Sequence, residues 1–243
     1  MPSLFSKSEL HDLIIKVERG ERLNFAEGVR LMESKDILAL GYMANLVRER
    51  KNGNNTYFMV NRHINHTNIC VNLGRFCKLP FDMRTNATML YGHIETSEER
   101  IDHFIRLREL QDRTGGFLTF MPLPFLPKNT QLEGTMGVQS TTGFEDLKVL
   151  AVSRIMLDNF DHVKAFWIML GPKLAQVSLS FGVDDLDGTV IEERIIHAAG
   201  DQTGQAMTKR ALINMIKKAG RIPVERDILY SVLNYYGTEG GES

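Results

Sequence analysis

Residues 85–121 read TNATMLYGHIETSEERIDHFIRLRELQDRTGGFLTFM, and this stretch decides the fold class. Residues 85–91 form a strand candidate rich in β-branched and aromatic residues. A helix is expected over residues 97–112, because Thr96 and Glu99 have the spacing of a capping box. The next strand candidate is the FLTFM at the end of the stretch. Two parallel strands need a crossover of this length, so the stretch predicts a β-α-β unit.

The same alternation continues towards the C-terminus. We expect a helix over residues 142–157, a strand over 163–170 and a helix that begins with Pro172, a residue that suits the first helical turn. Two further helices are expected over about 190–199 and 209–219, each followed by a glycine. Strands that alternate with helices in this way predict a parallel sheet covered by helices.

The first 55 residues have a helical rather than a strand periodicity. Expected helices follow a capping box at Ser6 and Glu9, a cap at Asn24 and a start near Asp36. A closed (β/α) barrel needs eight strand-helix units, and the sequence offers only four or five credible barrel strands. The predicted fold class is therefore α/β, an incomplete TIM-type barrel over residues 56–243 with C-terminal helices and a helical N-terminal extension over 1–55.

Composition excludes several classes of function. The chain has 243 residues, of which 43% are hydrophobic and 24% charged, and a formal net charge of −1. Its Lys and Arg residues are scattered, so we expect no nucleic-acid partner. No apolar run approaches the roughly 20 residues of a membrane span, and the N-terminus lacks a signal-peptide core, so the expected location is the cytoplasm without membrane contact. Nothing in the sequence fixes the oligomeric state.

Both cysteines lie in residues 61–77, NRHINHTNICVNLGRFC. Taken alone, two cysteines with six residues between them favour buried thiols over a metal site. The segment, however, resembles the cluster-binding loop of radical-SAM enzymes, Cys-x-x-x-Cys-x-x-Cys with an aromatic residue before the last cysteine. Cys70, Phe76 and Cys77 match this pattern, and Gly74 stands where the middle cysteine falls.

More narrowly, the chain resembles the aminofutalosine synthase branch of that superfamily, which acts in menaquinone biosynthesis by the futalosine pathway. Family members carry several βα units where this chain has only residues 78–83. The resemblance rests on blocks along nearly the whole chain: 61–70, 84–96, 108–112, 114–117, 156–160, 167–176, 184–190 and 223–227.

This resemblance implies a 4Fe–4S cluster held by thiolates, here Cys70 and Cys77, with S-adenosylmethionine on the open iron. It implies a reaction in which the deoxyadenosyl group adds to the small-molecule substrate 3-[(1-carboxyvinyl)oxy]benzoate and gives aminofutalosine. A cellular electron donor is the further implied partner. The substrate is a carboxylic acid, so Arg62 and Arg84 are the candidate substrate-binding residues.

The remaining candidates lie on or after the strand at 85–91. Side chains alternate across a strand, so Asn86, Thr88 and Leu90 should share one face, which we assign to the barrel lumen. Asn86, Thr88 and Tyr91 are the candidate cofactor-binding residues. His93 follows the strand at the carboxyl rim, where barrel enzymes place their catalysts, and is the candidate catalytic residue; capping of the next helix is the alternative.

Other residues receive structural roles. Asp185, Asp187, Glu192 and Glu193 are expected to cap helices or to lie on solvated helix faces. The aromatic and methionine residues of the later strands, Phe117, Phe120, Met121, Phe166 and Trp167, are expected in the core.

Two functional alternatives stay open. In the first, the chain is a truncated, catalytically inactive member of the family without a competent cluster, and the strands on either side of the gap pair directly into an open sheet. In the second, the chain is a barrel hydrolase or lyase that uses His93 with Glu95, although no nucleophile or phosphate loop accompanies that pair.

Overall fold

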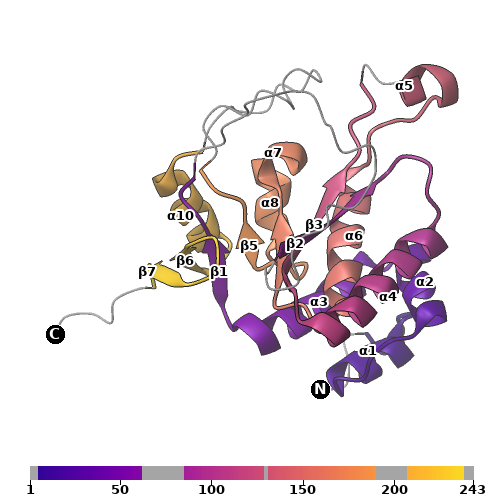
Figure 1. Cartoon of the computed structure of the whole chain (residues 1–243). Helices are drawn as coiled ribbons and strands as arrows, with labels where there is room; N and C mark the ends of the chain where they lie inside the picture. The colour runs from indigo at the N-terminus through magenta and orange to yellow at the C-terminus, as the bar shows by residue number, and fades with distance from the viewer. Residues whose placement is uncertain (1–4, 62–84, 129–130, 190–206, 238–243) are drawn as a thin grey trace.

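The computed structural model describes residues 5–61, 85–128, 131–189 and 207–237 (Figure 1). Within these ranges helices and strands alternate after an N-terminal group of three helices, which lie with α4 at the lower right of Figure 1. The helices are α1 (His11–Glu18), α2 (Phe25–Glu33), α3 (Ile37–Asn52), α4 (Ser97–Thr114), α5 (Gln131–Met136), α6 (Gly143–Met156), α7 (Trp167–Leu170), α8 (Pro172–Ser178) and α10 (Lys209–Lys218).

The strands form one mostly parallel sheet in the order β2-β3-β4-β5-β1-β6-β7, and only the β6–β7 pair is antiparallel. The strands are β1 (Asn55–Phe58), β2 (Thr85–Tyr91), β3 (Phe117–Pro124), β4 (His162–Ala165), β5 (Asp185–Leu186), β6 (Ile222–Arg226) and β7 (Val232–Tyr235). A parallel sheet with covering helices confirms the predicted α/β class.

Strands β1 and β2 follow one another in the described part of the chain but do not pair. Strand β1 lies between β5 and β6, and β2 is at the far end of the sheet, paired only with β3 among the described strands. Consecutive strands of a closed barrel would be neighbours. The described sheet is therefore open between β1 and β2, which agrees with an incomplete TIM-type barrel.

Two hydrophobic clusters hold the helices to the sheet. The first joins the N-terminal helices, α4 and α6 to the helix-facing side chains of β2 and β3. The second lies under α7, α8 and α10 and includes Trp167, Phe58 and Val163. Because α1–α3 share a core with β2 and β3, they are integral to the described fold; the predicted domain division at residue 55 stays a prediction.

Capping residues in the sequence predicted the starts of several helices correctly. Asn24 and Glu27 form a capping box for α2, and Thr96 and Glu99 form one for α4. The predicted box at Ser6 and Glu9 is wrong. Helix α1 begins at His11 without a side-chain cap, and the Glu9 carboxylate instead accepts a hydrogen bond from the Ser34 hydroxyl at 2.5 Å.

The predicted strand over 163–170 is too long. Strand β4 ends at Ala165, and residues 167–170 turn into the short helix α7. A short apolar run does not distinguish a strand from a buried helix, and here the Trp167 indole N–H donates to the Gly188 carbonyl at 2.9 Å. The strands β6 and β7 were not predicted, and the helix expected over 190–199 lies outside the described residues.

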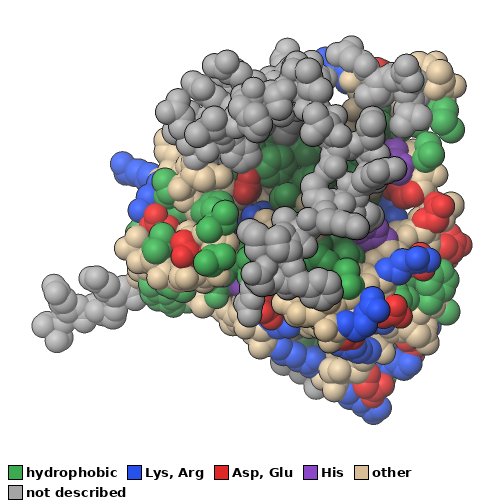
Figure 2. Space-filling model, in the orientation of Figure 1, with side chains coloured by type: hydrophobic (Ala, Val, Ile, Leu, Met, Phe, Trp, Pro, Cys, Tyr) green, Lys and Arg blue, Asp and Glu red, His purple; other side chains and the backbone are tan. Residues whose placement is uncertain are grey.

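The described helices include none long and apolar enough to cross a membrane. Acidic and basic side chains are interspersed over the helices at the lower right of Figure 2. This distribution matches the near-zero net charge of the chain.

The buried Asp184 carboxylate joins α6 to the middle of the sheet. It pairs with the Arg154 guanidinium of α6, and both side chains are inaccessible to solvent. It also accepts a hydrogen bond from the Val163 N–H at 2.8 Å and lies 2.6 Å from His162 Nδ1. Burial alone would raise the pKa of Asp184, but the attraction of Arg154 and the contact with His162 outweigh it and hold the pKa below its usual value.

Substitution of Asp184 by alanine tests this junction. Asp184→Ala leaves the Arg154 charge buried and unpaired, so we expect a loss of about 3–5 kcal/mol in the free energy of unfolding. Urea denaturation followed by circular dichroism measures it. The matched control is Asp102→Ala, which removes an exposed ion pair with Arg106 and should cost about 0.5 kcal/mol or less. Equal losses in the two variants would contradict the assigned role of Asp184.

Candidate functional site

Strand β2 presents two chemically different faces. Asn86, Thr88 and Leu90 are exposed, whereas Ala87, Met89 and Tyr91 are buried against the helices. The alternation confirms the predicted division of the strand into two faces. We call the face that carries Asn86 and Thr88 the inner face of the sheet, because the covering helices contact the opposite one.

Tyr91 does not share this inner face with Asn86 and Thr88. Its hydroxyl donates to Asp146 Oδ1 at 2.8 Å, and the Arg100 guanidinium carbon lies 5.6 Å from its ring centroid. The structure thus places the Tyr91 side chain among helix residues, apart from the other two candidates for cofactor binding. The cofactor-binding assignments stay predictions.

His93 lies in a tight turn at the carboxyl end of β2. Gly92 has φ +85°, and a Cβ atom there would lie 2.3 Å from Thr141 Cγ2, so only glycine fits this position. The Glu95 carboxylate accepts hydrogen bonds from the Gly92 N–H at 2.5 Å and the His93 N–H at 3.0 Å. It also lies 2.8 Å from His93 Nδ1. Glu95 therefore fixes both the backbone and the ring of His93.

Arg100 holds Glu95 in place from α4. Its guanidinium bonds the Glu95 carboxylate at 2.8 Å and Glu145 of α6 at 2.8 Å. Burial alone would raise the pKa of Glu95, but the backbone N–H donors and Arg100 outweigh it and lower the pKa below its usual value. A shallow depression of about 410 Å³ borders this turn and is lined by His93, Glu95 and Arg100, among others.

The inner face of the central strands carries four buried charges that the sequence reasoning missed. They are Lys164 of β4, Asp185 of β5, Asp187 just after it, and Arg226 of β6, each with 6% or less of its surface exposed. The expectation that Asp185 and Asp187 cap helices or lie on solvated helix faces is wrong. They lie in the sheet because β5 inserts between β1 and β4.

The Arg226 guanidinium is held by an ion pair and by a ring contact, and its Nη2 atom has no hydrogen-bond partner among the described residues. The guanidinium bonds the Asp185 carboxylate at 2.6 Å and lies 3.9 Å from the ring centroid of Tyr230. The Tyr230 ring in turn stacks on His162 at 3.8 Å. Burial and the nearby Asp185 charge raise the pKa of Tyr230, so its hydroxyl stays protonated. This column of rings and charges closes the inner face on the side of β6.

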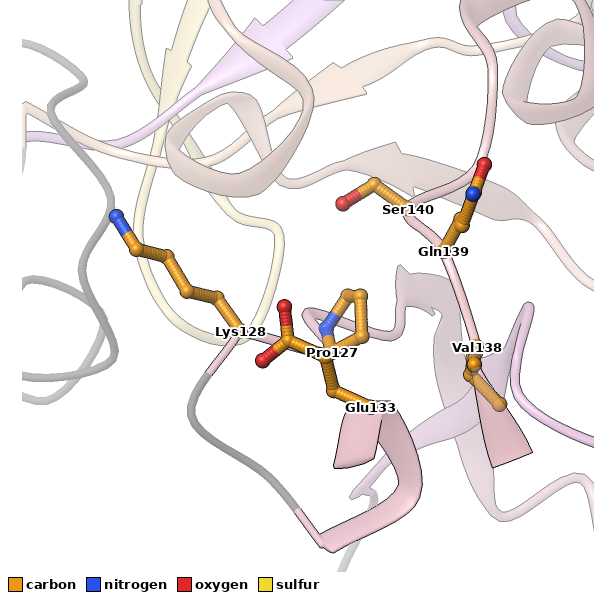
Figure 3. Close-up of a pocket in the computed structure, with 7 residues that line it drawn as sticks. Pro127, Lys128, Glu133, Val138, Gln139 and Ser140 are labelled. Atoms are coloured by element: carbon orange, nitrogen blue, oxygen red, sulfur yellow. The ribbon is translucent and has the colours of Figure 1, made fainter. Parts of the chain in front are cut away.

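A second depression, of about 510 Å³, lies in the connection between β3 and α6. Figure 3 shows Lys128 and Glu133 on one segment and Val138, Gln139 and Ser140 on the segment that faces it. Helix α5 belongs to this connection and projects at the upper right of Figure 1. The depression follows the carboxyl end of β3 and is thus at the same edge of the sheet as His93.

The predicted metal ligands Cys70 and Cys77 and the predicted substrate-binding residues Arg62 and Arg84 lie outside the described residues, as does Gly74. Of the predicted site residues, the structure describes His93, Asn86, Thr88 and Tyr91. It brings Asn86 and Thr88 onto one face and His93 to the end of the same strand.

The C-terminal half of the chain, residues 114–237, matches the family model for the CofH/MqnC C-terminal region. The chain belongs to the CofH/MqnC family. The matched residues contain β3, β4, β5 and β6, and with them all four inner-face charges.

Two curated proteins are similar to the chain. The chain is 62% identical to the aminodeoxyfutalosine synthase of Thermus thermophilus over 147 residues, which cover 60% of this chain and 40% of the relative. It is 37% identical to the aminodeoxyfutalosine synthase of Streptomyces coelicolor over 242 residues, which cover 95% of this chain and 62% of the relative. These matches confirm the predicted resemblance to aminofutalosine synthases of the radical-SAM superfamily.

The fold also has a counterpart among solved structures. The FeFe-hydrogenase maturase HydG from Carboxydothermus hydrogenoformans superimposes with a TM-score of 0.62 at 12% identity, over 92% of this chain and 81% of that one. At this identity the likeness concerns the fold alone. The CofH/MqnC chain described here spans 40% and 62% of the length of the two curated relatives.

Removal of the Tyr91 hydroxyl separates a structural role from cofactor binding. Burial raises the pKa of Asp146, and the hydrogen bond from Tyr91 opposes this rise. Tyr91→Phe should therefore raise the pKa of Asp146 further, measurable by carbon-13 NMR of its carboxyl, and cost about 1–3 kcal/mol of unfolding free energy.

The cost should depend on pH. A carboxyl whose folded pKa is raised stabilises the native state below its ordinary pKa and loses that effect as the pH rises through the folded pKa. The ionised form accepts the stronger hydrogen bond, so the deficit of Tyr91→Phe should be largest at neutral pH and shrink towards acid pH. Tyr42→Phe, which removes an exposed contact with Glu18, is the control. An unchanged Asp146 pKa would refute the assigned contact.

Proposed function

We propose that the protein is a radical-SAM transferase of menaquinone biosynthesis. The proposed reaction joins the deoxyadenosyl group of S-adenosylmethionine to 3-[(1-carboxyvinyl)oxy]benzoate, with water as the co-reactant. It releases methionine and one carboxyl group as bicarbonate and gives aminofutalosine. The observation that carries the proposal is the 62% identity to an aminodeoxyfutalosine synthase over the 147 aligned residues.

The described geometry supports a binding function for the inner face. Asn86 and Thr88 present polar groups there, on the same face as the buried charges of β4 and β5 and separated from them by β3. His93 lies at the carboxyl end of β2, which is the edge where (β/α) barrels bind and transform their ligands. A rigid support for His93 from Glu95 and Arg100 is what a positioned catalytic group requires. In this proposal Asn86 and Thr88 serve the cofactor, the buried Tyr91 supports their strand from the helix side, and Arg62 and Arg84 serve the substrate carboxylates.

The sulfur ligands of the chain do not fit the cofactor that the family implies. Iron–sulfur clusters are held by cysteine thiolates, and a radical-SAM cluster takes three of them. The chain has two cysteines in all, Cys70 and Cys77, and Gly74 has no side-chain donor. The proposed transferase therefore requires one further ligand from outside this pair, and we derive no reaction step through the cluster.

A second candidate function is that of an inactive family member without a competent cluster. Two observations favour it: the glycine at position 74 and the separation of β1 from β2 in the sheet. An open sheet exposes the polar inner-face side chains of β2 to water, which a radical reaction must exclude.

Anaerobic reconstitution of the chain distinguishes the two candidates. Near four irons and four sulfides per chain, cleavage of S-adenosylmethionine on reduction, and aminofutalosine formation support the transferase. A colourless protein without iron after reconstitution, in parallel with a relative that does assemble its cluster, overturns it and supports the inactive member.

Restoration of the missing thiolate tests the ligand shortage directly. We expect Gly74→Cys to bind iron and sulfide in near-stoichiometric amount, because it completes the three-thiolate set. If the open sheet limits catalysis, the variant should still form no aminofutalosine. Iron and sulfide analysis and chromatography of the reaction mixture measure the two outcomes. Gly74→Ser is the matched control, since it adds a side chain without a thiolate, and equal iron content in both variants would contradict the expectation.

A further inference from the structure

Lys164 is a buried lysine on the inner face of the sheet. Only 5% of its surface is exposed. Its neighbours in β4, Val163 and Ala165, point the other way into the hydrophobic cluster under the helices. Lysine is almost never buried to this degree unless its ammonium is paired, so the partner of Lys164 decides its role.

That pairing is incomplete among the described residues. Lys164 Nζ lies 3.6 Å from Asp187 Oδ1, close enough for an ion pair but too far for a hydrogen bond. No hydrogen bond joins the ammonium to another group of the described chain. An ammonium has three N–H donors, and those of Lys164 remain available to an acceptor that enters from the inner face.

The other buried cations differ in this respect. Arg154 bonds Asp184 and the carbonyls of Gly182 and Phe160. Arg226 bonds the Asp185 carboxylate. Arg154 and Arg226 each have a carboxylate oxygen within hydrogen-bond distance, although Arg226 Nη2 itself makes no hydrogen bond in the described part of the chain. Of the two inner-face cations, Lys164 is the one without a carboxylate of the described residues within that distance.

Apolar side chains flank Lys164 on the side of β3, whereas Asp185 lies beside it on β5. The register of β3 on β4 pairs Phe120 with Val163, so Met121 lies beside Lys164 one residue further on. Met121 and Leu123 alternate with the buried Phe120 and Pro122 and are partly exposed. Thr88 is the partner of Met121 on β2. An apolar strip on β3 beside an ammonium group matches a flat aromatic ring that carries a carboxylate, since small-molecule sites are mostly apolar with a few placed polar groups.

We propose that Lys164 is the anchor of a carboxylate-binding subsite on the inner face, which takes the carboxylate of an aromatic acid while the ring packs on Met121 and Leu123. The identity of that acid as 3-[(1-carboxyvinyl)oxy]benzoate rests on the proposed function. The subsite itself rests on the burial and unused donors of Lys164.

Substitutions of Lys164 and of its neighbour Asp187 should change the affinity for the aromatic acid in opposite directions. A bound carboxylate shares the Lys164 ammonium with Asp187, and the two negative charges repel each other. Lys164→Met removes the attraction and should weaken binding of the aromatic acid by about tenfold or more. Asp187→Asn removes the repulsion and should leave binding equal or tighter. A site in which Asp187 contacts the ligand predicts the reverse for Asp187→Asn.

Binding is measured on the full chain by isothermal titration calorimetry with 3-[(1-carboxyvinyl)oxy]benzoate and with 3-hydroxybenzoate, which keeps only the ring carboxylate. Lys217→Met, at an exposed position of α10, is the matched control and should bind like the wild type. S-adenosylhomocysteine carries an amino-acid carboxylate in place of an aromatic one, and its affinity should be the same in Lys164→Met and in the wild type. Absence of binding to the wild type, or equal affinity in Lys164→Met, overturns the proposal.

A folding control and a readout of affinity alone separate loss of the subsite from loss of the fold or of the reaction. Circular dichroism establishes whether each variant is folded. If Lys164→Met is unfolded, the affinities of Lys164→Arg and Asp187→Asn for the acid are compared with that of the wild type instead. Lys164→Arg keeps the positive charge and should keep binding. Weaker binding in Asp187→Asn contradicts the subsite. Because the readout is affinity, a chain that binds the acid through Lys164 yet makes no aminofutalosine retains the subsite and loses only the proposed function.

Discussion

The Asp184 carboxylate is the contact on which the centre of the molecule depends. It neutralises the buried Arg154 of α6 and accepts the N–H of Val163 in β4. The backbone carbonyl of the same residue accepts the N–H of Tyr57 in β1 at 2.7 Å. One residue thus fixes a helix and two strands relative to the start of β5, and the side chains that follow it, Asp185 and Asp187, take their places on the inner face as a consequence.

The strand order explains both the chemistry that the fold offers and the part that it lacks. Insertion of β5 between β4 and β1 brings Lys164 and Asp185 side by side, in register, on the inner face. On the far side of this face, β2 presents Asn86 and Thr88 to solvent because no described strand joins β2 to β1. The inner face therefore has buried charged groups on β4 and β5 and a solvent-exposed strand at β2. This arrangement is consistent with ligand binding and unfavourable for a reaction that must exclude water.

The sequence predicted the local features of this fold and missed those that depend on strand pairing. The capping box at Thr96 and Glu99 and the alternation along β2 act over a few residues, so both were predicted correctly. Lys164 and Asp187 are 23 positions apart, and only the parallel pairing of β4 with β5 makes them neighbours. The acidic run that contains Asp187 was assigned to helix caps and solvent for the same reason. A lysine between two apolar residues in a predicted strand was the one available signal.

A crystal structure of the chain grown with 3-[(1-carboxyvinyl)oxy]benzoate shows whether the inner face organised by Asp184 binds the acid. We expect electron density for the acid against Met121, with one carboxylate oxygen within hydrogen-bond distance of Lys164 Nζ. Density for the acid in the depression between β3 and α6, or none on the inner face at saturating concentration, would contradict this expectation.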